Sequence, residues 1–168
     1  MNDLDSKIDM GFTYVIEHIR DGVVIDAEKV HNIIPIEGLN HMMGVTFKAV
    51  TQVATWYLAL YEGNYSPTSD LTAATFPALA TETTAYTPAS RVEFNEGAVA
   101  GGSVDNSANK AQFTFTAAKT VYGGAILSSS VRGAVSGVIM SAVRFPSPKV
   151  LAVGDVLQVT AGNLLVSA

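Results

Sequence analysis

Few residues of this sequence have the types and spacing that acid–base or metal chemistry requires. The three histidines, His18, His31 and His41, occur in no H-x-E or HExxH pattern and beside no paired carboxylates, so we expect no metal site. Glu93 and Glu96 could act as paired acids, but they lie across the end of an expected strand on which Glu93 points outward. We interpret them as part of a solvated strand face.

Patterns for nucleophilic catalysis and phosphate binding are missing as well. The sequence has no cysteine, which excludes a thiolate nucleophile, and no G-x-S-x-G motif that would position a serine. The pairs Gly101-Gly102 and Gly123-Gly124 lack the spacing of a phosphate-binding loop, and chain reversal or close backbone approach explains them better. We therefore expect a protein that is not an enzyme, with no cofactor, no metal and no small-molecule substrate.

Composition and charge favour a protein that binds other proteins. The 168 residues carry a net charge of −5 with no run of lysine or arginine, so we expect no direct binding of nucleic acid. Hydrophobic residues make up 48% and charged residues only 15%, which favours uncharged polar strand faces or apolar surface that a partner covers. No stretch is long and apolar enough to span a membrane, and no signal peptide is recognised, so we expect a soluble protein made in a cytoplasm.

The chain is predicted to begin with an arm and a β-hairpin. Residues 1–11 are polar and acidic without periodicity, and we expect them to form a flexible arm. Residues 12–30 are predicted to form two strands joined at Asp21-Gly22, a dipeptide that accepts the positive φ angles of a two-residue turn. Only part of this hairpin is expected to be buried, which makes it a candidate clasp for a neighbour. The residues that share one face of its first strand are Phe12, Tyr14 and Ile16.

The next segments predict one helix, one central strand and an irregular excursion. Residues 36–48 follow Pro35 and are predicted to form a short amphipathic helix. Residues 55–61 are aromatic and β-prone, as in a central strand. Residues 62–90 are rich in Thr, Ala, Ser and Pro, and we expect an ordered excursion rather than a linker. The apolar residues at helical spacing are Ile36, Leu39, Met43 and Phe47.

The second half of the chain has the alternating pattern of half-buried strands. Val92 and Phe94 are predicted to point inward between Arg91, Glu93 and Asn95, and Phe113 and Phe115 are predicted to point inward between Gln112, Thr114 and Thr116. Further strands are expected over residues 121–128, 137–145 and 156–166, with Pro146 and Pro148 separating the last two. About eight strands with one early helix predict a mainly β fold, a jelly roll or β-sandwich. Residues 12–168 are interpreted as a single domain, with the sandwich over residues 55–168.

Two stretches of the sequence resemble a group of small structural proteins of tailed bacteriophages. In residues 32–61, an "N-x-x-x-x-E-G-L-N" motif begins at Asn32 and a "T-W-Y-x-x-L" motif begins at Thr55. In residues 93–130, a "G-G-x-V-D-N-S" motif begins at Gly101 and leads to "F-T-x-x-A-x-K-T-V-Y-G-G". The resemblance implies a jelly-roll decoration or cement protein on the capsid surface of the virion, and it brings no catalytic residues.

The expected partners are the major capsid protein and further copies of this chain, as a homodimer or homotrimer held by several weak contacts. An alternative is a carbohydrate- or receptor-binding module of a tail or fibre, in which Trp56 and Tyr57 would be exposed instead of Trp56 lying in the core. A head–tail or tail component is a third possibility. The contact residues expected in the arm and the hairpin are Asp3, Leu4, Asp5, Tyr14, Ile16, Arg20, Val23 and Ile25.

Overall fold

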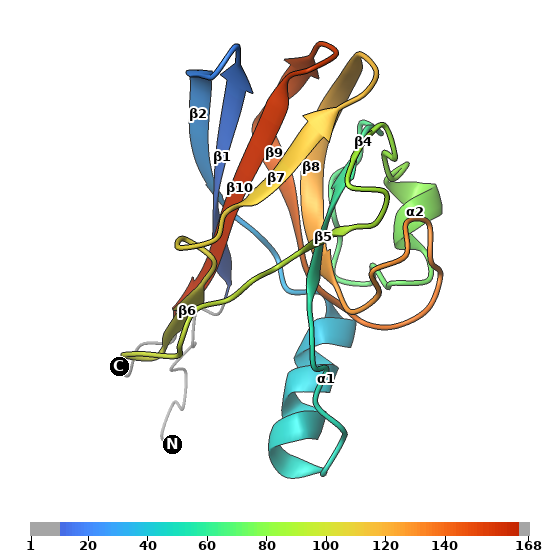
Figure 1. Cartoon of the computed structure of the whole chain (residues 1–168). Helices are drawn as coiled ribbons and strands as arrows, with labels where there is room; N and C mark the ends of the chain where they lie inside the picture. The colour runs from blue at the N-terminus through green and yellow to red at the C-terminus, as the bar shows by residue number, and fades with distance from the viewer. Residues whose placement is uncertain (1–10, 165–168) are drawn as a thin grey trace, which may run out of the picture.

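The computed structural model describes residues 11–164 and shows two antiparallel β-sheets that form a β-sandwich (Figure 1). The six-stranded sheet has the order β2 (Val23–His31), β1 (Phe12–Arg20), β10 (Val156–Leu164), β7 (Ala111–Phe115) and β4 (Tyr86–Thr87), and β6 (Ser103–Asp105) pairs with β10. The four-stranded sheet has the order β5 (Val92–Glu93), β3 (Tyr57–Tyr61), β8 (Lys119–Leu127) and β9 (Ile139–Leu151). The helices are α1 (Ile36–Phe47) and α2 (Phe76–Leu79).

The predicted fold class is confirmed, with some differences in detail. The described residues contain ten strands rather than about eight, and two helices rather than one. The two extra strands, β4 and β6, are only two and three residues long, too short for alternation to identify them. Neither described helix is long and apolar enough to cross a membrane. The predicted arm lies outside the described residues except for Gly11.

The N-terminal hairpin forms at the predicted turn. Asp21 and Gly22 have φ angles of 50° and 77°, as a two-residue hairpin turn requires. β1 is buried on one face, whereas most of β2, at the edge of the sheet, is exposed, so the predicted partial burial is confirmed. However, β1 also pairs with β10 along nearly its whole length. The hairpin is therefore part of the sandwich and not a ribbon beside it.

The central part of the four-stranded sheet is buried on both faces. Leu58 and Leu60 belong to the core cluster between the sheets, which also contains Phe113 and Phe115. The opposite face, with Tyr61, is covered by residues 62–90 and their short helix α2. The prediction of an ordered excursion is therefore confirmed. The residues that it packs against the outer face of the sheet are Leu71, Ala73, Phe76 and Ala80.

Two predictions near this sheet were wrong. β9 continues through Pro146 and Pro148, because its ladder with β8 passes from Lys149 directly to Arg144 and leaves both prolines in a bulge of an edge strand. Arg91 was expected to point outward, but its side chain is fully buried and binds the carboxylate of Glu82 through two hydrogen bonds of 2.8 Å. The ion pair with Glu82, which lies in residues 62–90, thus outweighs the outward orientation that the alternating pattern predicts for Arg91.

The two glycine pairs have the structural roles that were predicted for them. Gly101 and Gly102 have φ angles of 58° and 77° at a chain reversal. A Cβ atom on Gly123 would overlap the Tyr61 hydroxyl and the Val143 carbonyl, so only glycine allows this close approach between strands. Both pairs therefore serve the fold.

Candidate functional site

Helix α1 extends away from one end of the sandwich and is fixed to it through a glycine and a glutamate (Figure 1). A Cβ atom on Gly38 would lie 2.9 Å from the carbonyl oxygens of Ile139 and Met140, which shows how closely the helix approaches β9. The Glu37 carboxylate accepts hydrogen bonds from the backbone N–H groups of Ala73 (2.9 Å) and Ile139 (2.7 Å). The first turn of the helix is therefore held by contacts with the main chain of the sandwich, and position 38 has no room for a side chain.

This attachment turns the apolar stripe of the helix outward. The face toward the body carries Gly38, His41, Met42 and Val45, which lie about 180° around the helix from the stripe at 3.6 residues per turn. An apolar stripe ordinarily faces the core of its own protein, but here it is exposed. We call the following residues the α1 face, with their exposed fractions: Ile36 52%, Leu39 39%, Met43 58%, Phe47 70% and the adjacent Val50 46%.

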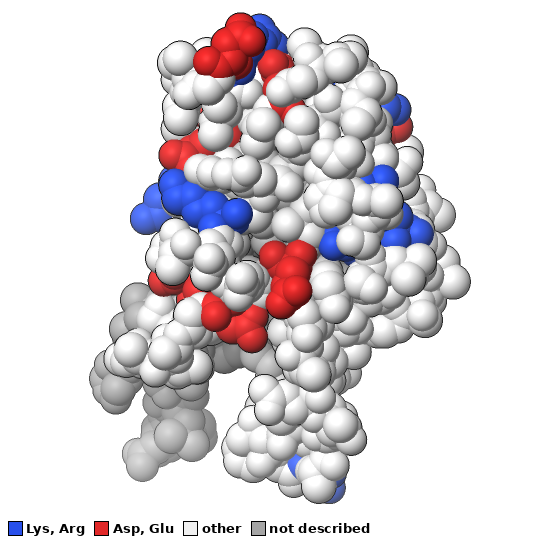
Figure 2. All heavy atoms as spheres, viewed as in Figure 1, with Lys and Arg blue, Asp and Glu red and all other residues white. Residues whose placement is uncertain are grey.

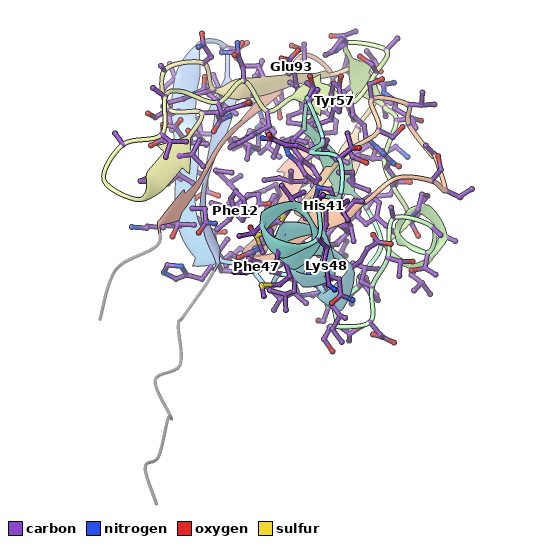
Figure 3. The ribbon with its side chains drawn as sticks, turned by 90° about the horizontal axis from the view of Figure 1, so that it is seen from below. Phe12, His41, Phe47, Lys48, Tyr57 and Glu93 are labelled. Atoms are coloured by element: carbon purple, nitrogen blue, oxygen red, sulfur yellow. The ribbon has the colours of Figure 1, made fainter. Side chains whose placement is uncertain are left out.

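Two hollows lie beside α1. A groove of about 360 Å³ is lined by Met42, Met43, Trp56 and Met140, and a hollow of about 260 Å³ lies between Trp56 and Phe12. Figure 3 shows the molecule from below, looking toward the end of α1, with His41, Phe47 and Lys48 labelled around the helix. Apolar hollows lined by methionine adapt readily to a bound side chain, because the thioether is flexible and polarizable.

Trp56 lines both hollows and is neither fully buried nor fully exposed. Its indole packs against the core cluster and meets the His41 ring edge to face, with 5.7 Å between ring centroids. Tyr57, the first residue of β3, is half-buried. Neither side chain is therefore the freely exposed platform that the sugar-binding alternative expected, but Trp56 does line a surface groove.

The α1 region is almost free of charge. Between residues 36 and 56, the acidic and basic side chains are Glu37, whose carboxylate is engaged as described, and Lys48 at the tip. Figure 2 shows the protruding part as white except for this lysine, whereas acidic and basic residues are spread over the body. A face of this kind can be buried without desolvating a charge.

The structure separates the residues that were predicted to contact a partner. Tyr14 and Ile16 are fully buried, which corrects the prediction for both, because the inward face of β1 forms the core. The Tyr14 hydroxyl lies 2.6 Å from the Ser141 hydroxyl, and burial raises its pKa well above the ordinary value. Val23 and Ile25 are exposed at 62% and 50% near the hairpin turn, as a contact role requires. Asp3, Leu4 and Asp5 lie outside the described residues.

Arg20, another predicted contact residue, is engaged in an ion pair. Its guanidinium donates to both oxygens of Asp155, at 2.9 and 2.7 Å, and the buried His18 ring lies 2.8 Å from the same carboxylate. Arg20 is the main cause that holds the pKa of Asp155 well below its usual range, with the Ala152 N–H and His18 contributing. This cluster joins β1 to the turn before β10.

A second ionic cluster ties β2 to the other sheet. The buried ammonium group of Lys149 in β9 binds the carboxylates of Asp26 and Glu28. Hydrogen bonding to Lys149 lowers the pKa of Asp26. For Glu28, desolvation raises the pKa, but its hydrogen bonds to Lys149 and Ser147 outweigh this and lower it overall. Part of the exposed edge strand is therefore held to the sandwich by charge.

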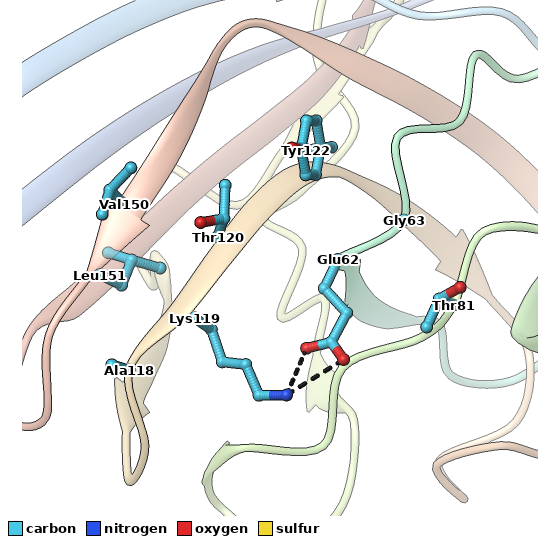
Figure 4. Close-up of a pocket in the computed structure, with 9 residues that line it drawn as sticks. All are labelled: Glu62, Gly63, Thr81, Ala118, Lys119, Thr120, Tyr122, Val150 and Leu151. Atoms are coloured by element: carbon cyan, nitrogen blue, oxygen red, sulfur yellow. Dashed lines mark hydrogen bonds and ion pairs between the residues drawn. The ribbon is translucent and has the colours of Figure 1, made fainter.

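A shallow polar hollow of about 530 Å³ lies at the outer side of β8 (Figure 4). Lys119 Nζ lies 3.0 and 2.8 Å from the two carboxylate oxygens of Glu62, and the side chains point toward each other. Thr120 and Tyr122 add a hydroxyl and a half-buried aromatic ring. Carboxylate, ammonium, hydroxyl and aromatic groups are among those that contact small polar ligands in binding sites.

The remaining candidates for chemistry stay apart. Glu93 is exposed, as expected. His31 lies 3.0 Å from the Thr13 hydroxyl, while His18 and His41 make the separate contacts described above. Within residues 11–164, no three histidine or carboxylate side chains are grouped to hold a metal ion.

The fold and these surfaces define a mainly β sandwich protein with an apolar, outward-facing helix. Residues 30–167 match the family described as podophage GP4 fiber I protein gp80, and the chain belongs to this family. It is therefore a bacteriophage structural protein and a virion component. The matched residues begin near the end of β2 and include α1, the groove of Met42 and Trp56, and all strands from β3 onward. No curated protein is significantly similar to it.

The sequence alone did not identify the α1 face as exposed. The amphipathic stripe was recognised and the helix agrees within one residue of its predicted end, but the pattern does not say which side meets the sandwich. A signal was present in Gly38, which allows close approach on the side opposite the stripe. Met42 and Val45 on that side show that the helix has two apolar faces.

Proposed function

We propose that this protein is a structural subunit of a phage fibre, and that it acts by binding other proteins rather than by catalysis. The observation that carries the proposal is the family match over residues 30–167, whose description is a fiber protein. The match favours the tail or fibre alternative over the capsid-decoration interpretation of the sequence.

The surface of the described chain supports a binding role. An apolar helix face that stays exposed in an isolated chain is unfavourable in water, and patches of this kind mark protein contacts. In a stable assembly, neighbouring subunits would bury such a face, which is exposed in the isolated chain.

The location of the protein in the virion tests this proposal. Purified phage particles are labelled with antibody raised against the chain, and the gold label is located by electron microscopy. Label along the fibres supports the proposal. Label spread regularly over the head contradicts it and favours capsid decoration with the major capsid protein as partner.

A second candidate function is saccharide binding at the hollow of Glu62 and Lys119. The observation that favours it is the grouping of a carboxylate, an ammonium, threonine hydroxyls and the Tyr122 ring around one open hollow. A fibre subunit with such a site would contribute to recognition of the host surface.

A further inference from the structure

We propose that the α1 face binds a second copy of this chain, so that two copies associate helix to helix. The proposal deepens the fibre-subunit function and rests on it, since a fibre is built from associated chains. It names the surface that joins them.

The exposed area of the α1 face is large enough to matter in association. With about 150–200 Å² for a fully exposed residue of this size, its five residues expose roughly 400–500 Å². The largest apolar patch on a typical monomer is about 300–600 Å² and is often functional. A stable interface buries about 800 Å² on each partner, and the Met42 and Trp56 groove beside the helix provides further area.

Charge favours a second copy as the occupant. The chain carries a net charge of −5, so the repulsion between two copies is smallest where they meet at a face without charge. The α1 face is such a face. The charged side chains between residues 36 and 56 are Glu37, whose carboxylate is bound to backbone N–H groups, and Lys48 at the tip. A strongly anionic partner, such as nucleic acid or an acidic lipid surface, would find Lys48 as its single cation in this region, which is too little for charge-driven binding.

The position of α1 allows this contact without a collision of the two bodies. The helix extends beyond the end of the sandwich (Figure 1), so the helix of another copy can lie alongside it. Packed helices are typically about 8–10 Å apart. In a two-fold arrangement the same patch is used by both copies, and Met43, near the middle of the stripe, then lies close to Met43 of the second copy whichever way the helices run.

Light scattering of the purified full-length chain and two glutamate variants tests the proposal. We expect the unmodified chain to associate and Phe47→Glu to be monomeric, because the charge would be buried at the contact. Val153→Glu is the matched control, because Val153 is 69% exposed, like Phe47 at 70%, but lies in the turn between β9 and β10. We expect it to associate normally. A monomeric unmodified chain, an associated Phe47→Glu chain, or loss of association in both variants would overturn the proposal.

Cross-linking gives a second, independent measurement. The natural chain has no cysteine, so each single-cysteine variant reports on one position. Under mild oxidation, Met43→Cys is expected to form a covalent dimer, whereas Val23→Cys, of similar exposure, is expected to remain uncoupled. A Met43→Cys chain that is monomeric and resists a maleimide would show that the chain's own residues cover the face, and would overturn the proposal. Both assays use purified protein. Failure of the helix contact is therefore distinguishable from failure of the fibre-subunit function, which antibody labelling of the virion tests.

Discussion

Gly38 in α1 lies directly against the main chain of Met140 in β9, and this contact decides which side of the helix faces outward. A Cβ atom at Gly38 would be 2.9 Å from the Met140 carbonyl oxygen and 3.1 Å from its Cα atom. Both neighbours are backbone, which cannot move aside as a side chain can. The orientation of the α1 face therefore depends on the absence of a side chain at one position.

The first prediction is that Gly38→Ala destabilises the protein. The added methyl group must displace α1 or β9, and overpacking of this kind costs about 1–3 kcal/mol. Gly44→Ala is the control, because alanine favours the helix by up to about 1 kcal/mol at either position, but the Cβ atom at position 44 would meet only the Val50 side chain. Urea unfolding measures both. Equal losses of unfolding free energy would contradict the role of the backbone contact.

The second prediction concerns the buried ion pair of Arg91 and Glu82. Arg91→Met leaves the Glu82 carboxylate buried without its main partner, and the expected loss of stability is about 3–5 kcal/mol. The double variant Arg91→Met with Glu82→Gln should recover part of it. Lys110→Met, which removes the more exposed pair with Glu17, should cost about 0–1 kcal/mol. Chemical denaturation of the four proteins measures these differences, and a small loss for Arg91→Met would contradict the prediction.

The third prediction is that the Asp155 cluster weakens in acid. The folded-state pKa of Asp155 lies below its unfolded value of about 3.9, so folding favours the ionised form. The resulting stabilisation is complete above about pH 5 and is lost as the pH falls toward the folded-state pKa. Arg20→Gln removes the main cause of the shift, and it should lower the melting temperature at pH 7 more than at pH 3. If Arg20→Gln lowered the melting temperature equally at pH 7 and at pH 3, Arg20 would not be the main cause of the shifted pKa of Asp155.

The fourth prediction tests the polar hollow as a saccharide site. Glu62→Gln keeps the size of the side chain but removes the charge, so binding that depends on the carboxylate should weaken about tenfold, equivalent to 1.4 kcal/mol. The probe is a panel of neutral hexose oligosaccharides in calorimetric titration, with Lys110→Met as a variant outside the hollow. Equal affinity of the Glu62→Gln and Lys110→Met chains would remove this site from consideration.

Local signals in the sequence predicted the elements whose environment is also local. The Asp21-Gly22 turn and the alternation around Phe113 were confirmed because turn geometry and strand periodicity depend on neighbouring residues. Arg91 was wrongly placed because its partner, Glu82, lies in an irregular segment without periodicity. The extent of β9 was missed because a bulge removes Pro146 and Pro148 from the ladder.

The candidate site was harder to predict than the fold. Tyr14 and Ile16 were assigned to a contact surface although their shared face forms the core, because the inward face of β1 packs against side chains of the other sheet, such as Leu58. The α1 face depends on a contact between residues about a hundred positions apart in the chain, Gly38 and Met140. No pattern within the helix contains that information.

The last prediction uses Trp56, the only tryptophan of the chain, to report on the groove beside the α1 face. The groove is lined by both Trp56 and Met43, so a second copy packed on α1 should shield the indole from acrylamide. Phe47→Glu, by separating the copies, should increase the quenching of Trp56 fluorescence and shift the emission to longer wavelength. Val153→Glu should leave both unchanged. If Phe47→Glu dissociates the copies without changing the quenching, the groove lies outside the contact, and the helix stripe alone joins the two chains.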